Sequence, residues 1–325
     1  MSLLDKIPGE LKLYIGGVYT LRRKQQLEEA NITHILSVHR LPVDKALVSP
    51  FEHLLVEVDD VEDENLLQYF TTTNAFIQQG LDGGGGVLVH CAMGKSRSAT
   101  CVIAYLMSKY HISPQEALAQ VKQCRPLVEP NDGFMQQLEM YHQMQTPINV
   151  EESPVYQRWM YQREVQLSSE CGMAPDADKI RFEDEHITPD EEGKFADAEF
   201  KCKKCRTTLA KSHFLIPHPQ LPHTKPFPEA LTCAHLFLDP LSWMRPELEQ
   251  GKVEGRLECP KCKSNVGKYA WQGMRCSCGS WVIPAITLAK GKVDERRART
   301  PGEGGVRKVP GVGMPATSAQ GRGLL

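Results

Sequence analysis

The sequence lacks an excess of either charge and lacks any long apolar run. Its 325 residues carry a formal net charge of −2, which gives no reason to expect bulk attraction to nucleic acid or membranes. We therefore expect no DNA partner, and no membrane span because about 18 consecutive apolar residues are missing. The segment Met1–Glu10 places charges early, at Asp5 and Lys6, unlike a signal peptide. An intracellular protein of about two domains is expected.

Cysteine, by contrast, is abundant, with 11 residues. In a reducing compartment, this abundance indicates metal ligands or catalysis rather than a disulfide framework. Cys91 stands alone in a Gly-rich turn, whereas seven cysteines fall within 202–278, mostly in close pairs. Three others, Cys101, Cys124 and Cys171, have no assigned role, and Cys101 is expected to be a core residue.

Residues 1–147 alternate between short aliphatic runs and helical patterns, which predicts an α/β sheet covered by helices. A helix is expected at 65–79, ended by Gly80, and another begins with the capping box at Ser113. Four strands are expected, at Leu11–Ile15, Ile32–Val38, Leu54–Val58 and Gly86–Val89.

The remainder of the chain divides by composition into three parts. Residues 148–195 are expected to be a connector, helical over 151–169 and then an acidic, mobile linker over 176–192. Residues 196–290 are rich in Cys, Pro, Trp and short β-like runs, which predicts a small, mainly-β domain. Residues 291–325 place arginines among Gly and Pro and are expected to be a disordered basic tail.

A phosphate-binding turn is predicted at 90–98, after the apolar strand 87–89. A turn that feeds a helix N-terminus points several backbone N–H groups into one concavity, which binds an anion and stabilises a thiolate. Such a setting can lower a cysteine pKa from about 8.5 to roughly 3.5–7.5, so we predict that Cys91 is a nucleophile. The planar guanidinium of Arg97 matches two phosphate oxygens. The predicted phosphate-binding residues are Ala92, Met93, Gly94, Lys95, Ser96 and Arg97.

The pattern His-Cys-x5-Arg-Ser resembles the protein tyrosine phosphatase superfamily, and within it the dual-specificity branch. Leu13-Tyr14-Ile15-Gly16 and Asn131-Asp132-Gly133-Phe134 are also similar to that family. The resemblance implies that Asn131 buttresses the cradle and that the Ser98 hydroxyl helps the thiolate leave. It implies that His90 orients the loop rather than transferring protons.

A general acid must protonate the leaving oxygen. The family carries it about ten residues before the Tyr-Phe of the next helix, which corresponds here to Asp60. Asp59, Glu62 and Asp63 are then a solvated acidic loop. Lys95 departs from the usual dual-specificity pattern and is shared with lipid phosphatases, so a phosphoinositide substrate is a second choice. Met93 is another departure from the usual cradle.

The C-terminal cysteines have the spacing of structural zinc sites. Two CxxC pairs are typical of zinc knuckles, and three further thiols leave one ligand missing for two four-coordinate sites. Either pairing is open: a linear one, or an interleaved one that joins the two CxxC pairs, which we slightly prefer. Saturated sites of this kind are structural, not catalytic. The predicted cysteine ligands are Cys202, Cys205, Cys233, Cys259, Cys262, Cys276 and Cys278, and the candidate histidines are His213, His218, His223 and His235.

The two regions together resemble a small family of eukaryotic zinc-binding dual-specificity phosphatases linked to assembly of the large ribosomal subunit. Segments 202–206, 240–244 and 269–282 carry the resemblance, which spans about 11–295. It implies that His218, rather than His235, is the eighth zinc ligand. It implies a phosphoprotein substrate, pre-ribosomal particles or ribosomal proteins as partners, and a cytoplasmic and nuclear location. Two functions remain open: an active protein phosphatase, or an assembly factor whose zinc domain does the essential work while catalysis is dispensable.

Overall fold

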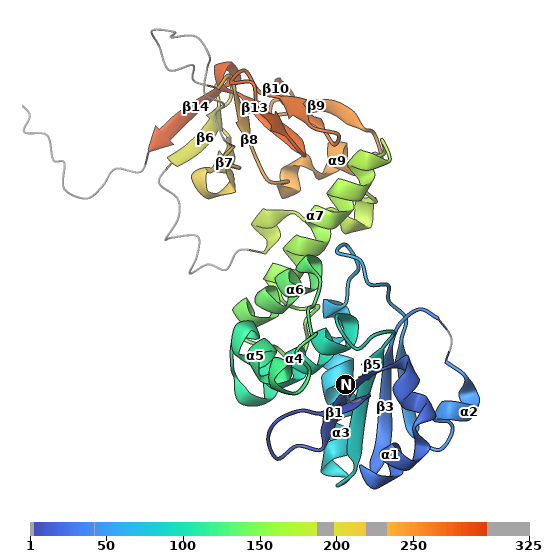
Figure 1. Ribbon diagram of the computed structural model, residues 1–325. Coiled ribbons are helices and arrows are strands. Elements are labelled where there is room, and N and C mark those ends of the chain that lie inside the picture. The colour runs from blue at the N-terminus through green and yellow to red at the C-terminus, as the bar shows by residue number, and fades with distance from the viewer. Residues whose placement is uncertain (1–2, 42, 187–197, 219–232, 298–325) are drawn as a thin grey trace, which may run out of the picture. The chain divides into compact units, whose positions relative to one another are not determined.

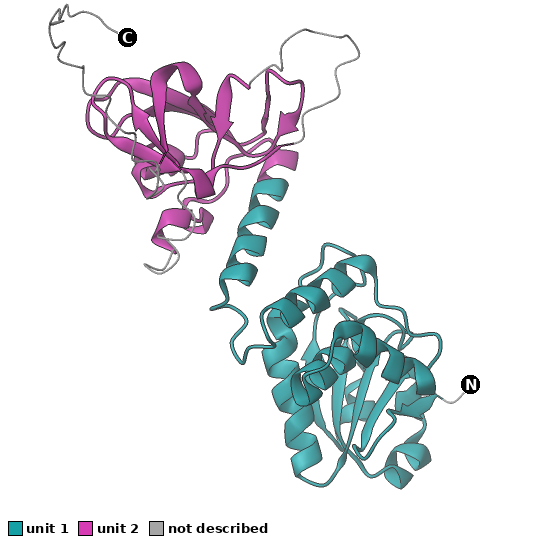
Figure 2. Ribbon diagram, turned by 90° about the vertical axis from the view of Figure 1, so that its left-hand side faces the viewer, with its two compact units in different colours: residues 1–167 teal, residues 168–325 magenta. Residues whose placement is uncertain are grey.

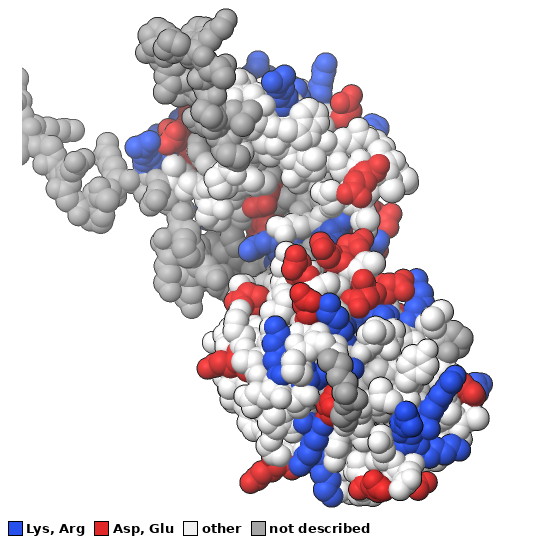
Figure 3. Space-filling view, viewed as in Figure 1, with Lys and Arg blue, Asp and Glu red and all other residues white. Residues whose placement is uncertain are grey.

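The computed structural model describes residues 3–41, 43–186, 198–218 and 233–297. The chain forms two compact units, Met1–Leu167 and Ser168–Leu325 (Figure 2). None of the described helices is long and apolar enough to cross a bilayer. Neither sign of charge covers the face of the molecule that Figure 3 shows.

The first unit is built on a five-stranded sheet in the order β1-β2-β5-β3-β4 (Figure 1). All neighbours are parallel except β1, which pairs antiparallel with β2. The strands are β1 Leu4–Lys6, β2 Leu13–Gly17, β3 Ile32–Val38, β4 Glu52–Val56 and β5 Gly86–Cys91. The helices are α1 Lys24–Glu29, α2 Lys45–Val48, α3 Phe70–Asp82, α4 Arg97–Tyr110, α5 Pro114–Cys124, α6 Asp132–Gln143 and α7 Pro154–Glu170, whose last residues belong to the second unit.

Strand β5 lies in the middle of this sheet and is buried along its whole length. Because successive side chains point to opposite faces, Val87 and Val89 join the large cluster under α3 and α4. Leu88 joins a smaller cluster beside α1. Apolar packing on both faces therefore fixes the end of β5, where Cys91 lies.

The second unit is mainly β, as expected. It contains a four-stranded sheet, β8-β13-β10-β9, a three-stranded sheet, β14-β6-β7, and the pair β11-β12. Its elements are β6 Ala198–Cys202, β7 Thr208–Lys211, β8 His235–Phe237, α9 Arg245–Leu248, β9 Glu254–Glu258, β10 Asn265–Ala270, β11 Met274–Arg275, β12 Trp281–Val282, β13 Ala285–Ala289 and β14 Val293–Arg297.

Several expected boundaries in the first unit need correction. The strands expected at Leu11–Ile15 and Leu54–Val58 lie at Leu13–Gly17 and Glu52–Val56. The helix expected at 65–79 begins as an α-helix only at Phe70 and continues through Gly80 to Asp82. Gly80 is buried inside α3 and does not end the helix. A Cβ at this position would lie 2.6 Å from a Val87 methyl group, so a larger residue would clash with β5. Close packing of α3 against the sheet therefore explains this glycine. The capping box at Ser113 is present as expected.

The expected acidic linker is also corrected over 176–186, which packs within the second unit. Ile180 and Phe182 are buried, and Arg181 forms a buried ion pair with Glu183. Asp184 accepts a hydrogen bond from the Ser242 backbone N–H at 2.7 Å. Two apolar side chains among many acidic ones are thus enough to order the segment. Residues 187–195 lie outside the described residues.

The basic tail was expected to begin at residue 291, but regular structure continues beyond that point. Val293–Arg297 forms β14, which pairs antiparallel with β6 in the register Val293↔Cys202. The second domain therefore extends at least to Arg297, beyond the expected limit at 290. Residues 298–325 lie outside the described residues.

Candidate active site and metal centres

The phosphate cradle connects β5 to α4, and its shape depends on a glycine. Gly94 has φ +68°, in the left-handed region that disfavours L side chains. A Cβ on Gly94 would lie 2.4 Å from the Gly16 carbonyl oxygen on β2. The turn therefore packs directly against β2, and only glycine fits there.

Cys91 lies at the base of this turn, with 1% of its surface exposed. Its Sγ accepts hydrogen bonds from the Gly94 N–H at 3.2 Å and the Ser98 hydroxyl at 3.3 Å. Burial opposes ionisation of the thiol. The Ser98 hydroxyl and the backbone N–H groups of Ser98, Lys95 and Gly94 outweigh burial, so the pKa of Cys91 is lowered. The arrangement stabilises a nucleophilic thiolate.

Asp60 and Arg97 face each other at the rim of the cradle. Asp60 Oδ1 accepts hydrogen bonds from the Ser96 hydroxyl at 2.6 Å and from Asn131 Nδ2 at 3.1 Å. Asp60 Oδ2 lies 3.7 Å from Arg97 Nε, and Arg97 Nη1 donates to the Val58 carbonyl oxygen at 3.1 Å. The predicted acid, the predicted phosphate-binding guanidinium and the buttressing asparagine are therefore brought together.

The neighbouring carboxylate, Asp59, is used differently. It pairs with the Arg40 guanidinium at 2.9 Å, and Glu64 also lies 3.3 Å from that guanidinium. Asp59 therefore belongs to a surface ion-pair cluster, whereas Asp60 is tied to the cradle. The structure distinguishes two adjacent residues of the same type by their partners.

His90 is fully buried behind the cradle. Burial lowers its pKa to about 4, so the ring is neutral at physiological pH. Nδ1 faces the Cys91 carbonyl oxygen at 3.4 Å and therefore carries the proton, which leaves Nε2 to accept from the Ser37 hydroxyl at 2.6 Å. Ser37 Oγ also lies 2.8 Å from His53 Nε2, which can donate to it. His90 is thus placed to orient the loop.

Arg125 is a supporting residue that the sequence did not reveal. It is buried, and it donates from Nε to the Gly94 carbonyl oxygen and from Nη2 to the Met93 carbonyl oxygen, both at 2.8 Å. Its Nη1 pairs with Asp5 on β1. With these carbonyls held from behind, the turn's N–H groups face the thiol.

The remaining predicted cradle residues occupy its mouth. The Lys95 ammonium lies 2.6 Å from the Glu129 carboxylate at the surface, and Met93 is 70% exposed. Ala92 lines a pocket of about 540 Å³ beside Cys91. The other lining residues are Val18, His39, Arg40, Leu41, Asp59, Asp60 and Arg97.

In the second unit, the eight predicted metal ligands form two groups in the interleaved arrangement. Within each group, the potential ligand atoms lie within 4.8 Å of one another. One group joins the two CxxC pairs, and the other contains His218 rather than His235. The groups are Cys202, Cys205, Cys259 and Cys262, and His218, Cys233, Cys276 and Cys278.

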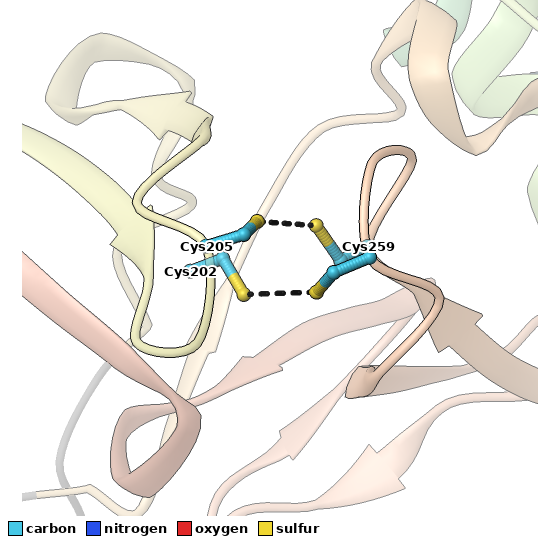
Figure 4. A group of neighbouring side chains, drawn as sticks. Cys202, Cys205 and Cys259 are labelled. Carbon is cyan, nitrogen blue, oxygen red and sulfur yellow. Dashed lines mark hydrogen bonds between the residues drawn. The ribbon is translucent and has the colours of Figure 1, made fainter.

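The interatomic distances fit a tetrahedral ion. Zinc–sulfur bonds of about 2.3 Å would place two sulfur atoms about 3.8 Å apart in a tetrahedron. Cys202 and Cys262 Sγ lie 3.8 Å apart, and Cys205 and Cys259 Sγ lie 3.5 Å apart, with the thiols pointing toward one another (Figure 4). Both groups can therefore hold a metal ion, and a set of four protein ligands leaves no open position.

The three other histidine candidates are not in these groups. His213 lies in the 3-10 helix Ser212–Phe214. His235 lies on β8, where it pairs with Ala289 of β13, and His223 lies outside the described residues. The three unassigned cysteines also lie outside the groups. Cys101 is fully buried in α4, so it is a core residue as expected, and burial raises the pKa of its thiol.

An HCx5R cradle at the end of a parallel strand, with an aspartate at its rim, defines a cysteine-dependent phosphatase. The family model "Dual specificity phosphatase, catalytic domain" matches residues 13–144. The crystal structure of the Yvh1 phosphatase domain from Chaetomium thermophilum is 42% identical, covers 45% of this chain and 99% of that chain, and has a TM-score of 0.43.

Similarity to named relatives extends over both units. The tyrosine-protein phosphatase YVH1 of Saccharomyces cerevisiae is 36% identical over 87% of this chain and 89% of its own. Its Schizosaccharomyces pombe counterpart is 34% identical over 91% and 86%. Human dual specificity protein phosphatase 12 is 30% identical over 91% and 89%. The chain therefore belongs to the dual-specificity phosphatases, in the family of the YVH1 tyrosine-protein phosphatases, and is an enzyme.

Proposed function

We propose that this phosphatase hydrolyses phosphotyrosine and phosphoserine or phosphothreonine in proteins through a phosphocysteine at Cys91. One observation carries the proposal: the buried Cys91 thiol, whose pKa is lowered, directly precedes Ala92, which lines the same pocket as Asp60 and Arg97. This geometry supplies a nucleophile, a cation for the phosphoryl oxygens and an acid for the leaving group.

In the first step, the Cys91 thiolate attacks phosphorus and the bond to the leaving oxygen breaks. Arg97 and the turn's N–H groups bind the phosphoryl oxygens. Asp60 gives its proton to the leaving oxygen, so the products are a free hydroxyl group and a phosphocysteine.

In the second step, water attacks the phosphocysteine. The Asp60 carboxylate takes a proton from this water, which restores the acid, and the sulfur–phosphorus bond breaks to release inorganic phosphate. The Ser98 hydroxyl donates to the departing sulfur, as its 3.3 Å contact with Cys91 allows. The cycle balances with water as its co-reactant: the water oxygen joins the phosphate, and the proton returns to Asp60.

Trapping the intermediate tests this chemistry. Rapid acid quenching during turnover of an aryl phosphate should recover a phosphoryl group on the peptide that contains Cys91, identified by mass spectrometry. A phosphoryl group on another residue, or full turnover with no covalent species in burst-phase measurements, would contradict the proposal.

A second proposed role concerns the zinc unit, which we take to hold two structural zinc ions and to bind pre-ribosomal large-subunit particles. Exposed basic side chains favour an anionic partner, since they lie within or next to the two knuckles. These side chains are Lys203, Lys204, Arg206, Lys261 and Lys263. Such a role would place the protein in the nucleus and the cytoplasm.

Co-sedimentation of the full chain with large-subunit precursors tests this second role. The paired change Lys261→Glu and Lys263→Glu should abolish co-sedimentation, whereas Cys91→Ser should preserve it. Loss with Cys91→Ser alone would place the contact at the phosphatase unit instead. Equal binding by all variants would refute the basic surface.

A further inference from the structure

Four large apolar side chains are exposed in the segments that line the catalytic pocket. Their exposed fractions are 63% for Tyr19, 75% for Leu41, 48% for Val61 and 70% for Met93. Each lines the pocket or directly follows a lining residue: Tyr19 follows Val18, Leu41 lines it, Val61 follows Asp60, and Met93 follows Ala92.

Single exposed apolar residues are ordinary on protein surfaces. These four, however, belong to four separate segments that each contribute a residue to the lining of one pocket, and such a concentration is typical of an interaction surface. Two of the loops are held together, because the Val18 N–H donates to the Ala92 carbonyl oxygen at 3.1 Å. A Cβ on Gly17 would lie 3.0 Å from the same oxygen, so these two loops are in close contact.

The charges in and beside the pocket lining disfavour a second anion. The segment 57–64, which carries Asp60, contains six carboxylates. Arg40 is held by Asp59 and Glu64, and Lys95 by Glu129. Among the described residues that line the pocket, Arg97 is therefore the cation available to a phosphate, because its distance to Asp60 is 3.7 Å whereas Arg40 lies 2.9 Å from Asp59. One phosphate occupies it.

We propose that this apolar rim selects phosphorylated protein segments with large apolar side chains next to the phosphoresidue. By the same geometry, it rejects acidic flanks, a second phosphate and polyanionic lipid headgroups. The inference rests on the proposed phosphatase function and names the substrate class of the same site. Apolar contact supplies affinity in proportion to buried area, while the carboxylates penalise added negative charge.

The test compares three phosphotyrosine peptides of equal length, flanked by leucine and phenylalanine, by serine, or by aspartate. It adds phosphatidylinositol phosphate vesicles as a further substrate and a small aryl phosphate as the baseline. We expect kcat/KM to be roughly three- to tenfold higher for the apolar than for the serine peptide, and lowest for the acidic peptide. Added salt should reduce the difference in kcat/KM between the acidic and the serine peptide, because salt screens charges. It should leave the advantage of the apolar peptide unchanged, because apolar contact is not screened.

Variants locate the effect. Tyr19→Ser and Val61→Ser should reduce the advantage of the apolar peptide through KM while leaving aryl phosphate turnover unchanged. Tyr110→Ser is the matched control, since Tyr110 is 46% exposed on α4 and does not line the pocket.

Three outcomes would overturn the inference. These are equal kcat/KM for the three peptides, a preference for the acidic peptide, or faster hydrolysis of the vesicles than of any peptide. Aryl phosphate turnover by the unmodified chain separates the proposed phosphatase function from the proposed selectivity of the rim. If the chain does not hydrolyse the aryl phosphate, the proposed function is refuted. If it does so but does not distinguish the peptides, only the selectivity of the rim is refuted.

Discussion

In the first unit, one reactive cysteine lies at the edge of a large apolar core, whereas in the second unit cysteines make up much of a core. Cys91 joins a cluster that includes residues of β2, β3, β4, β5 and the five helices α3 to α7. A buried cluster of the second unit consists of Cys233, Phe237, Cys276, Cys278, Val282 and Ala285, so half of its members are potential metal ligands.

This difference shows that the neighbours of a thiol decide its role. Hydrogen bonds from a turn stabilise the Cys91 thiolate. The surrounding fold is stabilised by the burial of apolar side chains and does not depend on a metal ion. Four thiols within 4.8 Å of one another cannot all ionise unless a cation joins them. The two units should therefore respond in opposite ways to loss of metal and to loss of one thiol.

Metal removal should have the largest effect, and only on the second unit. Structural zinc supplies about 10–16 kcal/mol of apparent binding energy that is largely folding energy. A strong chelator should unfold the second unit, while aryl phosphatase activity persists. Tryptophan fluorescence reports the change, because three of the chain's four tryptophans, Trp243, Trp271 and Trp281, lie in that unit.

Metal analysis should find two zinc ions per chain. Cys205→Ser should lower this content and destabilise the second unit, whereas Cys171→Ser should do neither, since Cys171 is exposed and lies in neither group. His218→Ala should act like Cys205→Ser, and His235→Ala should not. A folded, freshly purified chain without zinc would contradict the prediction.

Replacing the Cys91 thiol in the first unit should abolish activity and leave both units folded. Cys91→Ser should reduce aryl phosphate turnover by roughly 10⁴-fold or more, because the serine hydroxyl stays protonated in this cradle. Unfolding of both units should change little. Cys101→Ser is the matched control in the adjacent helix: turnover per folded molecule should be retained. Residual activity near the wild-type level in Cys91→Ser would remove the thiolate from the mechanism.

A further prediction separates the two adjacent carboxylates Asp59 and Asp60. Asp60→Asn should reduce turnover by roughly 10²–10⁴-fold for poor leaving groups, the usual contribution of a general acid. The loss should shrink for leaving groups that depart without a proton. Asp59→Asn should change turnover little, because Asp59 pairs with Arg40 at the surface. An equal loss for all leaving groups would assign Asp60 a binding role.

The residues of the phosphate cradle could be predicted from the sequence because they lie close together along the chain. Cys91 and Arg97 lie on one continuous turn, so spacing alone places them together. The metal ligands were also predictable, although only the folded chain joins knuckles 54 to 60 residues apart. The interleaved pairing is a consequence of tertiary structure, since both pairings have acceptable ligand spacing.

Other features depend on contacts that no local pattern encodes. Arg125 reaches carbonyls more than 30 residues away, and an arginine after a helix is ordinarily solvated. Strand β14 reads Val-Asp-Glu-Arg-Arg and has one buried residue, so it shows no apolar alternation. Its order comes from backbone pairing with β6, which sequence composition does not reveal.

The smallest predicted effect concerns the hydrogen bonds behind the cradle. Ser37→Ala removes the donor to His90 Nε2, and with it the preference for the tautomer that donates to the Cys91 carbonyl oxygen. The pKa of Cys91 should then rise. A net hydrogen-bond contribution of about 0.5–1.5 kcal/mol corresponds to roughly half to one pH unit. The pH profile of iodoacetamide alkylation measures it.

The direction of the expected shift in the pH profile follows from the protonation state in which Cys91 reacts. Cys91 acts as the thiolate, so kcat/KM rises as pH increases through its pKa, and Ser37→Ala should shift this acidic limb to higher pH. The two enzymes should differ most at low pH and converge above both pKa values. His53→Gln keeps an N–H donor for Ser37 and should leave the limb in place. Thr73→Ala, which removes a buried hydroxyl in α3, should lower stability without moving the limb. If Ser37→Ala also lowers only stability, the hydrogen bonds to His90 support packing and not the thiolate.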